Sequence, residues 1–458
     1  MKLSKEKIGV MMNKMRENDI KKIFGGKKIT LMGLGLLGRG IGDAEFLATA
    51  GAELIVTDLK TEAELATSVE RLKKFPNITY HLGDHRLEDF EDRDMILRAP
   101  NVPLDSPFLA RARERGIPVE MDASLFAKLS GAMILGITGT RGKSTVTHLI
   151  YDMAQAAGKK PQLGGNERDV ATLQLLPKTN DGDLVILELD SWQLQGFEES
   201  KISPHIAVWT NFMPDHMNYY HGDMDRYFRD KASIARFQKP GDFFVTTPEI
   251  KEKIESTFGP LQGTCVIDTA LPADWIVALP GEHNRQNAGY AAAAAKILGV
   301  TEDVIKNILK SFSGLPGRLE FLGEKNGVAF YNDANSTTPE AGIAALRALA
   351  SLGRPIVLIA GGSDKEMNFE AFAREIEKSV KKTILFKGTA TEKLQALLPK
   401  ESHIEIAASM DEAFASACAA AEHGDTVLLS PGATSFGIFK NEYDRGDQFR
   451  ECVNALKK

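Results

Sequence analysis

The chain has 458 residues, of which 43% are hydrophobic and 26% are charged, as in an ordinary soluble globular protein. Its 56 Lys and Arg residues against 62 Asp and Glu residues give a net charge of −6, which excludes the basic surface of a nucleic-acid-binding protein. No apolar run reaches the ~18 residues of a membrane span. The three cysteines, Cys265, Cys418 and Cys452, lie far apart without metal-ligand spacing, which indicates a reducing compartment. We therefore expect a cytoplasmic protein of roughly two to four domains.

The N-terminal segment is rich in Lys and Met but lacks the continuous apolar core of a signal peptide. Ile8, Met11 or Met12, and Met15 follow one another at helical spacing. This spacing predicts a short amphipathic helix that packs on the first domain.

The first predicted domain, residues 1–121, opens with a strand over residues 28–32 and the glycine-rich turn GLGLLG at 33–38. A helix to about residue 50 and a second strand, which ends at Asp58, complete the fingerprint of a dinucleotide-binding fold. Alone, this fingerprint favours a nicotinamide oxidoreductase. Further strands are predicted at 95–97 and 117–119, and nothing between them resembles the acid or base of a nicotinamide site. We therefore interpret the domain as a Rossmann-like binder of a nucleotide or diphosphate.

The second predicted domain, residues 122–315, contains an apolar strand that ends at Ile137, the turn TGTRGKS at 138–144 and a helix over 145–153. Such a strand, turn and helix form a phosphate-binding loop, because backbone N–H groups and the helix N-terminus face an anion. The strict motif has glycine at position 137, so the first glycine of the turn is either Gly136 or Gly139.

Other polar residues follow the strands predicted after this loop. Glu188 comes directly after a strand over 184–187, and the Asp215–His216 pair follows a strand over 205–209. In an open α/β sheet, ligands bind at the carboxyl ends of the strands, where a carboxylate is placed to hold Mg²⁺. Residues 164–166 are expected to form a loop. The residues around Lys231, on a helix over 224–237, do not single it out, and its helical spacing from Tyr227, Phe228 and Ile234 leaves its direction open between the surface and the site.

The third predicted domain, residues 316–458, follows a hinge at 314–318 and repeats the unit of strand, polar loop and helix. This repetition predicts a second doubly wound α/β domain. Its strands are expected at residues 328–331, 356–359, 383–386 and 427–429. Before the hinge, the motif GEHNRQN at 281–287 opens an Ala-rich helix over 288–298.

Taken together, these motifs resemble those of the Mur ligases of peptidoglycan synthesis over nearly the whole chain, most closely the members that add D-glutamate. The matching motifs are GLGLLG at 33–38, TGTRGKST at 138–145, LELDSWQ at 187–193, PDHM at 214–217, GEHNRQN at 281–287, GLPGR at 314–318, Asn332–Asp333, and LSP at 429–431 through FKN at 439–441 to Arg445–Gly446.

The resemblance implies a three-domain α/β fold: a Rossmann-like N-terminal domain for the UDP part of the substrate, a central P-loop ATPase-like domain with a mostly parallel sheet, and a Rossmann-like C-terminal domain for the amino acid. It also implies an ATP-dependent ligase that adds D-glutamate to UDP-N-acetylmuramoyl-L-alanine through an acyl phosphate. The expected cofactors are two Mg²⁺ ions with ATP as co-substrate, and the expected state is a cytoplasmic monomer.

Site residues are implied in the same way. Ser144, Glu188 and His216 match metal ligands, and Lys231 matches the lysine that the family carbamylates; with Lys143, the residues Glu188, His216 and Lys231 form the catalytic set. The ATP site is implied at Gly139, Thr140, Arg141, Gly142, Lys143, Ser144, Thr145, Asn287, Arg318 and Asp333. The UDP-substrate site is implied at Gly35, Leu36, Leu37, Asp58, Asn166, Ser191 and Gln193, and the amino-acid site at Thr337, Lys365 and Ser435.

The chain departs from the family pattern at Asp190, Asn335, Gly432, Thr434 and Glu442. The change at Glu442 touches the amino-acid pocket, so a Mur-type ligase for a different amino acid is the alternative. A nicotinamide oxidoreductase would leave the second phosphate loop without a role. A non-enzymatic P-loop binding protein would need no amino-acid pocket.

Overall fold

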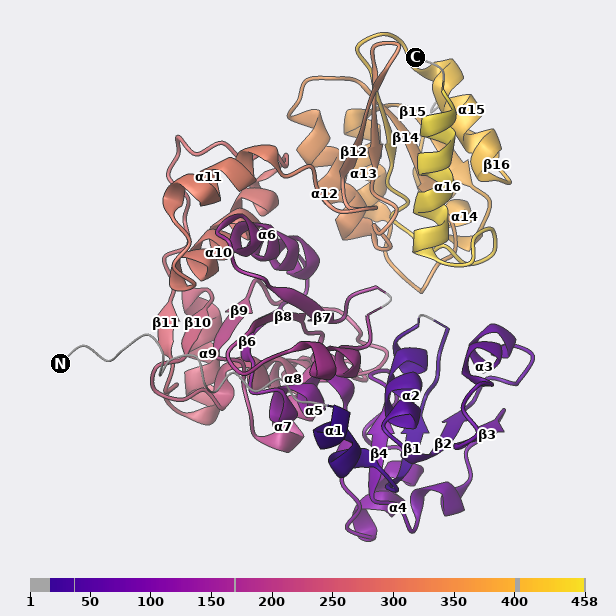
Figure 1. The fold of residues 1–458 in the computed structure, drawn as a ribbon. Coiled ribbons are helices and arrows are strands. Elements are labelled where there is room, and N and C mark those ends of the chain that lie inside the picture. The colour runs from indigo at the N-terminus through magenta and orange to yellow at the C-terminus, as the bar shows by residue number, and fades with distance from the viewer. Residues whose placement is uncertain (1–16, 37, 169, 400–403, 457–458) are drawn as a thin grey trace, which may run out of the picture. The chain divides into compact units, whose positions relative to one another are not determined.

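The computed structural model describes residues 17–36, 38–168, 170–399 and 404–456, and the helix expected around Ile8 to Met15 lies outside these residues. The chain divides into two compact units, which we describe separately. Unit 1 contains Met1–Ala270 and Gly289–Ile305, and unit 2 contains Leu271–Ala288 and Lys306–Lys458. Figure 1 shows three successive sheets with flanking helices.

The first sheet of unit 1 is parallel, with strand order β3-β2-β1-β4-β5. The strands expected around residues 28–32, 54–57 and 95–97 are present. Strand β3 was not expected, because only its first residue is fully buried and its apolar pattern is weak. The elements are α1 (Glu17–Phe24), β1 (Lys28–Met32), α2 (Arg39–Thr49), β2 (Glu53–Asp58), α3 (Ala66–Leu72), β3 (Ile78–Leu82), β4 (Met95–Arg98), α4 (Pro107–Glu114) and β5 (Val119–Glu120).

The second sheet of unit 1 is also parallel, with strand order β11-β10-β9-β6-β8-β7. Its central strands β6, β8 and β9 are buried almost throughout, which is why they appear in the sequence as continuous apolar runs. The elements are α5 (Asp122–Leu129), β6 (Met133–Thr138), α6 (Lys143–Ala156), β7 (Gln162–Gly165), η3 (Thr172–Lys178), β8 (Leu184–Glu188), α7 (Ser191–Ser200), β9 (Ile206–Trp209), α8 (Met224–Arg236), β10 (Phe243–Val245), α9 (Pro248–Phe258) and β11 (Thr264–Val266).

The prediction of a loop at residues 164–166 is wrong for Gly164 and Gly165, which are the last two residues of strand β7. Glycine is needed there because the neighbouring strand approaches closely. A Cβ on Gly164 would lie 2.9 Å from Leu187 Cδ2, and one on Gly165 would lie 2.1 Å from the Glu188 carbonyl oxygen. Close packing thus explains two glycines that resemble a turn in the sequence.

The two sheets of unit 1 share one hydrophobic core. Helix α2 of the first sheet packs on the short helix η3 of the second, and Gln174 Nε2 donates a hydrogen bond to the Gly42 carbonyl at 3.1 Å. A Cβ on Gly42 would lie 2.5 Å from Ala171 Cβ, so only glycine permits this contact. The nucleotide-binding fingerprint and the phosphate loop are therefore held in one packed body.

Unit 2 contains a six-stranded sheet with strand order β12-β13-β17-β14-β15-β16. The doubly wound pattern is confirmed, except that the unexpected edge strand β12 runs antiparallel to β13 and makes the sheet mixed. The elements are β12 (Glu320–Lys325), β13 (Val328–Asn332), α12 (Pro339–Ala350), β14 (Ile356–Gly361), α13 (Glu370–Ser379), β15 (Val380–Phe386), α14 (Thr389–Leu397), β16 (Ile404–Ala407), α15 (Met410–Ala420), β17 (Thr426–Leu429) and α16 (Glu442–Ala455). Helices α10 (Glu282–Ile297) and α11 (Glu302–Ser311) each contribute residues to both units.

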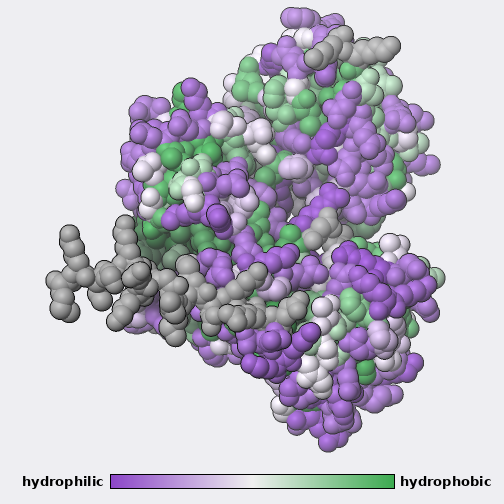
Figure 2. Space-filling model, in the orientation of Figure 1, coloured by the Kyte–Doolittle hydropathy of each residue, from purple (hydrophilic) through white to green (hydrophobic). Residues whose placement is uncertain are grey.

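Hydrophilic residues cover much of the face in Figure 2, with hydrophobic residues in smaller patches. Within the part of the chain that the structure describes, every helix is too short or too polar to cross a bilayer.

Candidate active site

The phosphate loop connects β6 to α6 and is shaped by two glycines in the left-handed region. Gly142 caps α6 with φ 84°, and Gly139 has φ 148°. A Cβ on Gly139 would lie 2.0 Å from Thr210 Oγ1. Gly136, the other candidate for the first glycine, lies inside strand β6. The turn therefore depends on Gly139 and Gly142.

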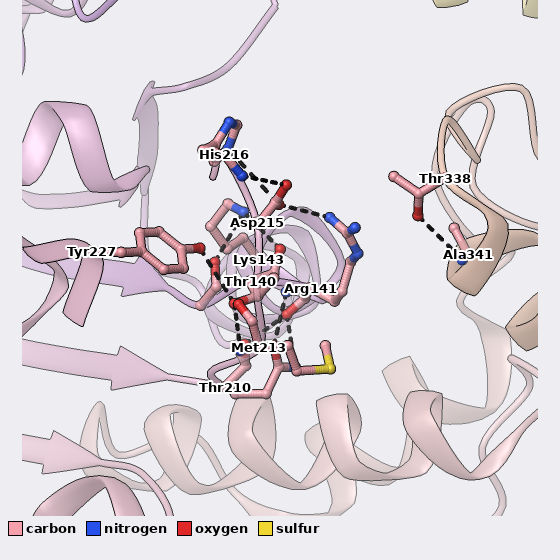
Figure 3. Close-up of polar contacts among 12 residues, drawn as sticks. Thr140, Arg141, Lys143, Thr210, Met213, Asp215, His216, Tyr227, Thr338 and Ala341 are labelled. Carbon is pink, nitrogen blue, oxygen red and sulfur yellow. Dashed lines mark hydrogen bonds and ion pairs between the residues drawn. The ribbon is translucent and has the colours of Figure 1, made fainter. Parts of the chain in front are cut away.

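The segment after β9 holds the loop in this shape (Figure 3). The Thr140 N–H donates to the Asn211 carbonyl at 3.0 Å, and the Arg141 N–H donates to Asn211 Oδ1 at 2.9 Å. The Met213 N–H donates to Thr140 Oγ1 at 3.0 Å, and Thr210 Oγ1 donates to the Arg141 carbonyl at 2.6 Å. These holding residues carry no motif in the sequence, because they contact the loop through two backbone groups and two short polar side chains.

Lys143 is the first residue of α6, and its side chain folds back over the loop. Its Nζ donates to the Gly139 carbonyl at 3.1 Å and to the Thr140 carbonyl at 3.3 Å. A phosphate that enters the loop would meet this ammonium group at the helix N-terminus.

Asp215 and His216 lie beside the loop, as expected from their place after β9 (Figure 3). Asp215 Oδ2 lies 3.0 Å from Arg141 Nη1, and the His216 N–H donates to Asp215 Oδ1 at 3.0 Å. Burial alone would raise the pKa of Asp215, but the charges of His216, Arg141 and Lys143 bring it below its ordinary value. Burial lowers the pKa of His216, which favours the neutral imidazole that can bind a metal.

Glu188 ends β8 and is 3% exposed. The neighbouring strand β7 leads into Asn166, whose N–H donates to the Glu188 carbonyl at 2.7 Å and whose Nδ2 donates to Glu188 Oε1 at 3.3 Å. The two residues singled out in the sequence are therefore in direct contact at the carboxyl edge of the sheet.

Lys231 is not on the surface, which settles the direction that its helical spacing left open. It is 1% exposed, and its Nζ donates to the Gly139 carbonyl at 2.9 Å and to Thr138 Oγ1 at 3.3 Å. Its Nζ also lies 5.0 Å from the centroid of the Tyr227 ring. Burial, and then the charge of Lys143, lowers the pKa of Lys231 well below its ordinary value.

A sequence signal for this burial existed. Lys231 comes four residues after Tyr227, three after Phe228 and three before Ile234, and all three of these residues are buried. Residues three and four apart share a helix face, so Lys231 lies on the face of α8 that packs inward.

In the first sheet, the glycine-rich turn is closed by Asp58. Its Oδ2 accepts from the Gly35 N–H at 3.0 Å and its Oδ1 accepts from the Lys60 N–H at 2.9 Å. Leu36 is 57% exposed at the tip of the turn, and Leu37 lies outside the described residues. Asp58 thus holds the turn, and Leu36 is available to a ligand.

Ser191 and Gln193 are buried in the first turn of α7. Asp190 caps this helix: its side chain accepts from the Gln193 N–H at 2.8 Å, and Gln193 Oε1 accepts from the Asp190 N–H at 3.3 Å. This capping box gives Asp190 and Gln193 a structural role in addition to the ligand role predicted for Gln193.

In unit 2, Asp333 follows β13 and is held by two donors. Ser430 Oγ donates to its Oδ2 at 2.8 Å, and the Leu319 N–H donates to its Oδ1 at 3.1 Å. Burial raises the pKa of Asp333 to about 7. Arg318 is exposed, and Asn287 is buried in the first half of α10.

Two loops of unit 2 that carry predicted amino-acid-binding residues are joined by backbone hydrogen bonds. The Ser363 N–H donates to the Thr434 carbonyl at 3.0 Å, and the Thr434 N–H donates to the Ser363 carbonyl at 3.1 Å. This pairing lies next to the exposed Lys365 on one loop and Ser435 on the other. Phe436, which no sequence motif singled out, is 58% exposed, and its ring centroid lies 5.6 Å from Lys365 Nζ. Thr337 is half-buried in a third loop.

Across the ranges that the structure describes, no group of three or more His, Cys, Asp or Glu side chains is arranged to hold a metal ion. The donor set near the phosphate loop still suits Mg²⁺, which keeps several waters and takes few protein ligands beside substrate phosphates. Ser144 offers a hydroxyl oxygen, Glu188 a carboxylate and His216 a neutral imidazole.

Models of three protein domains match the chain. They are described as "Mur ligase MurD-like, N-terminal domain" over residues 27–120, "Mur ligase middle domain" over 137–258 and "Mur ligase, glutamate ligase domain" over 317–432.

Curated relatives match along nearly their whole length. The UDP-N-acetylmuramoylalanine–D-glutamate ligase of Roseiflexus sp. (strain RS-1) is 38% identical over 94% of this chain and 99% of that protein. The protein of the same name from Borreliella afzelii (strain PKo) is 35% identical over 96% of this chain and 100% of its own length.

Solved structures share the three-domain α/β fold at lower identity. The UDP-N-acetylmuramate-alanine ligase MurC of Thermotoga maritima is 18% identical with a TM-score of 0.60, over 94% of this chain and all of that chain. The MurF ligase of Thermotoga maritima in complex with ADP is 14% identical with a TM-score of 0.58, over 95% of this chain and 96% of that chain.

Proposed function

The chain belongs to the Mur ligase family, and we propose that it adds D-glutamate to UDP-N-acetylmuramoyl-L-alanine at the expense of ATP. The observation that carries this proposal is the gathering of Lys143, His216 and the buried Lys231 around one phosphate loop. A nicotinamide oxidoreductase or a passive P-loop binder would leave this arrangement without a use.

The reaction activates a carboxylate before it forms an amide. A carboxylate oxygen of the L-alanyl group attacks the γ-phosphorus of ATP, and the bond from this phosphorus to the bridging oxygen of ADP breaks. The amine of D-glutamate then attacks the acyl phosphate, the amide C–N bond forms, and inorganic phosphate leaves with loss of a proton from nitrogen. The protein contributes alignment and charge neutralisation, which Lys143 and the helix N-terminus supply at the phosphates.

We propose that Ser144, Glu188, His216 and a carbamylated Lys231 hold two Mg²⁺ ions. When bound, these ions neutralise charge on the phosphate oxygens. Carbamylation requires the neutral amine, and the lowered pKa of Lys231 supports this assignment. It would also replace a cation beside the loop with an anion that offers oxygen ligands.

The remaining assignments are part of the same proposal, together with a cytoplasmic monomer and domain boundaries at residues 1–121, 122–315 and 316–458. They rest on the family motifs and on the placements described above. ATP would be bound by Gly139 to Thr145 with Asn287, Arg318 and Asp333; the UDP-substrate by Gly35, Leu36, Leu37, Asp58, Asn166, Ser191 and Gln193; and D-glutamate by Thr337, Lys365 and Ser435.

The test is ADP release measured with UDP-N-acetylmuramoyl-L-alanine over a panel of D- and L-amino acids. Release that requires both the UDP-substrate and D-glutamate supports the proposal. ADP release with another amino acid would favour a Mur-type ligase for that amino acid. This alternative is tested because Glu442, at the start of α16, departs from the family pattern. ADP release that requires neither the UDP-substrate nor an amino acid would identify a simple ATPase.

We expect Gly35→Val to weaken binding of the UDP-substrate and to leave ATP affinity nearly unchanged. Gly35 has φ 64°, so a side chain there strains the turn that Asp58 closes. Each ligand is titrated separately. Gly116→Val is the matched control, because Gly116 has φ 70°, also has open space around its Cβ position and lies in the same sheet domain, after α4. Equal loss of both affinities in Gly35→Val would contradict the assignment.

We expect Lys365→Ala to raise KM for D-glutamate far more than KM for ATP. Lys365 is an exposed cation whose Nζ lies 5.6 Å from the centroid of the Phe436 ring, and a point charge there can pair with a substrate carboxylate. Lys382→Ala is the control, because Lys382 makes an ion pair with Glu405 in strand β16 instead. An unchanged KM for D-glutamate in Lys365→Ala would show that another group binds its carboxylate.

A further inference from the structure

A series of buried and half-buried polar side chains runs through unit 1 near Lys231 and has no role in the proposed chemistry. We call Arg98, Gln195, Asp230 and Tyr220 the polar series. Arg98 and Gln195 are each 1% exposed, Tyr220 is fully buried and Asp230 is half-buried. Arg98 ends β4 of the first sheet, Gln195 lies on α7 and Asp230 lies on α8, so the series links the two sheets of unit 1.

The contacts along the series are short. Arg98 Nη2 donates to Gln195 Oε1 at 2.7 Å, and Gln195 Nε2 donates to Asp230 Oδ2 at 2.7 Å. The Tyr220 hydroxyl donates to the same Asp230 oxygen at 2.9 Å. Hydrogen bonds to charged groups are stronger than neutral ones, and burial protects them from water.

The two ends of the series fix the direction of the Gln195 amide. The guanidinium group of Arg98 can only donate, so it requires the amide oxygen. Asp230 Oδ2 accepts at this contact, as it does from the Tyr220 hydroxyl, so it requires the amide nitrogen. The reversed amide would place donor against donor and acceptor against acceptor. Gln195 therefore acts as a neutral bridge between a buried cation and a carboxylate of opposite charge.

At one end, the series holds the helix that carries Lys231. Successive residues of a helix point about 100° apart, so Asp230 and Lys231 anchor two different faces of α8. Lys231 reaches the phosphate loop, and Asp230 reaches Gln195 on α7, which packs against α8. Tyr220 adds a second support, since its ring centroid lies 5.0 Å from that of Tyr227, the ring beneath the Lys231 amine.

At the other end, the series holds the glycine-rich turn of the first sheet. Arg98 Nη1 donates to the Val102 carbonyl at 2.9 Å and so fixes the segment after β4. This segment lies against Gly33, where an added Cβ would be 2.8 Å from Ala99 Cβ and 3.5 Å from Val102 Cγ2. One continuous set of contacts therefore runs from the glycine-rich turn to Lys231.

We propose that Arg98, Gln195 and Asp230 are positioning residues that hold Lys231 in register with the glycine-rich turn of the UDP-substrate domain. The proposal goes beyond the family motifs, none of which includes these three residues. It rests on the proposed ligase activity, because its readout is turnover.

The test exchanges the amide and the carboxylate. Gln195→Glu keeps the side-chain volume but turns a carboxylate toward Asp230, and we expect kcat to fall on the order of tenfold, since small misplacements of a reacting group have effects of this size or larger. The double variant Gln195→Glu with Asp230→Asn restores a donor and an acceptor at each contact, and we expect its kcat to return to within about twofold of the wild type. KM for ATP should stay within about twofold in all variants, because the phosphate loop is held by other residues.

The control is Gln238→Glu, a buried glutamine of the same unit whose Nε2 donates to the Pro204 and Phe243 carbonyls. We expect this change to lower Tm without lowering kcat. A double variant as slow as Gln195→Glu, or a KM for ATP that rises as kcat falls, would overturn the positioning role. A wild-type chain without substrate-dependent ADP release would instead refute the proposed function.

Discussion

Lys143→Ala should lower substrate-dependent ADP release on the order of 10²-fold or more while the fold persists. The Lys143 ammonium lies over the phosphate loop, within 3.1 Å of the Gly139 carbonyl and 3.3 Å of the Thr140 carbonyl. Loss of one preorganised charge at a developing negative charge has an effect of this size in enzymes. The loop itself is shaped by Gly139, Gly142 and the segment after β9, so its structure does not depend on the lysine.

Turnover and thermal unfolding are measured on the same preparations. Lys159→Ala serves as the control, because Lys159 is exposed just beyond the other end of α6 and should change neither quantity. Near-normal turnover by a folded Lys143→Ala protein would refute the assignment of the phosphate loop.

The parts of the fold that the sequence predicted are those with strong local signals. Strands β6, β8 and β9 are buried on both faces, so they read as continuous apolar runs, and the polar residues after them fall at one edge because parallel strands point the same way. The sequence order alone therefore places Glu188, Asp215 and His216 at the same edge of the sheet.

The parts that the sequence missed depend on contacts between distant segments. Strand β12 pairs antiparallel at a sheet edge, and none of its residues is fully buried, so it lacks a clear apolar pattern. Gln193 matches a ligand-binding motif in the sequence, and only the structure shows that it forms a capping box with Asp190. Gln195 and Arg98 are 97 positions apart in the chain, so only the folded structure reveals their contact.

Lys231 belongs to both groups. Its spacing from buried residues on the same helix is consistent with its burial, but nothing in the sequence indicates which groups surround its amine. The amine lies in a site from which water is largely excluded, facing one backbone carbonyl, one hydroxyl and the ring of Tyr227. The nearby positive charge of Lys143 also opposes protonation. Such a site disfavours an ammonium ion and keeps the amine ready to react with CO₂, which forms a carbamate C–N bond and releases one proton.

We expect Lys231→Ala to be nearly inactive and to regain part of its turnover when a small carboxylate such as acetate is added. Acetate can occupy the space of the missing side chain and supply the oxygen ligands that a carbamate would offer to a hard cation. Lys231→Arg should stay inactive even with acetate, because the guanidinium group keeps its charge and fills the space. Turnover is measured against acetate concentration, with thermal unfolding as the check that each variant is folded.

Lys239→Ala is the matched control, because Lys239 is an exposed lysine just after the same helix and should keep wild-type turnover without any response to acetate. A second readout does not depend on activity: wild-type protein kept in ¹³C-labelled bicarbonate should show a carbamate carbon signal that Lys231→Ala lacks. Full turnover of Lys231→Ala without added carboxylate would remove Lys231 from the catalytic set. If acetate restores turnover of Lys231→Ala but the wild-type protein shows no carbamate carbon signal, Lys231 stays in the site and its carbamylation is excluded. Acetate would then act by filling the cavity of the missing side chain and not by replacing a carbamate.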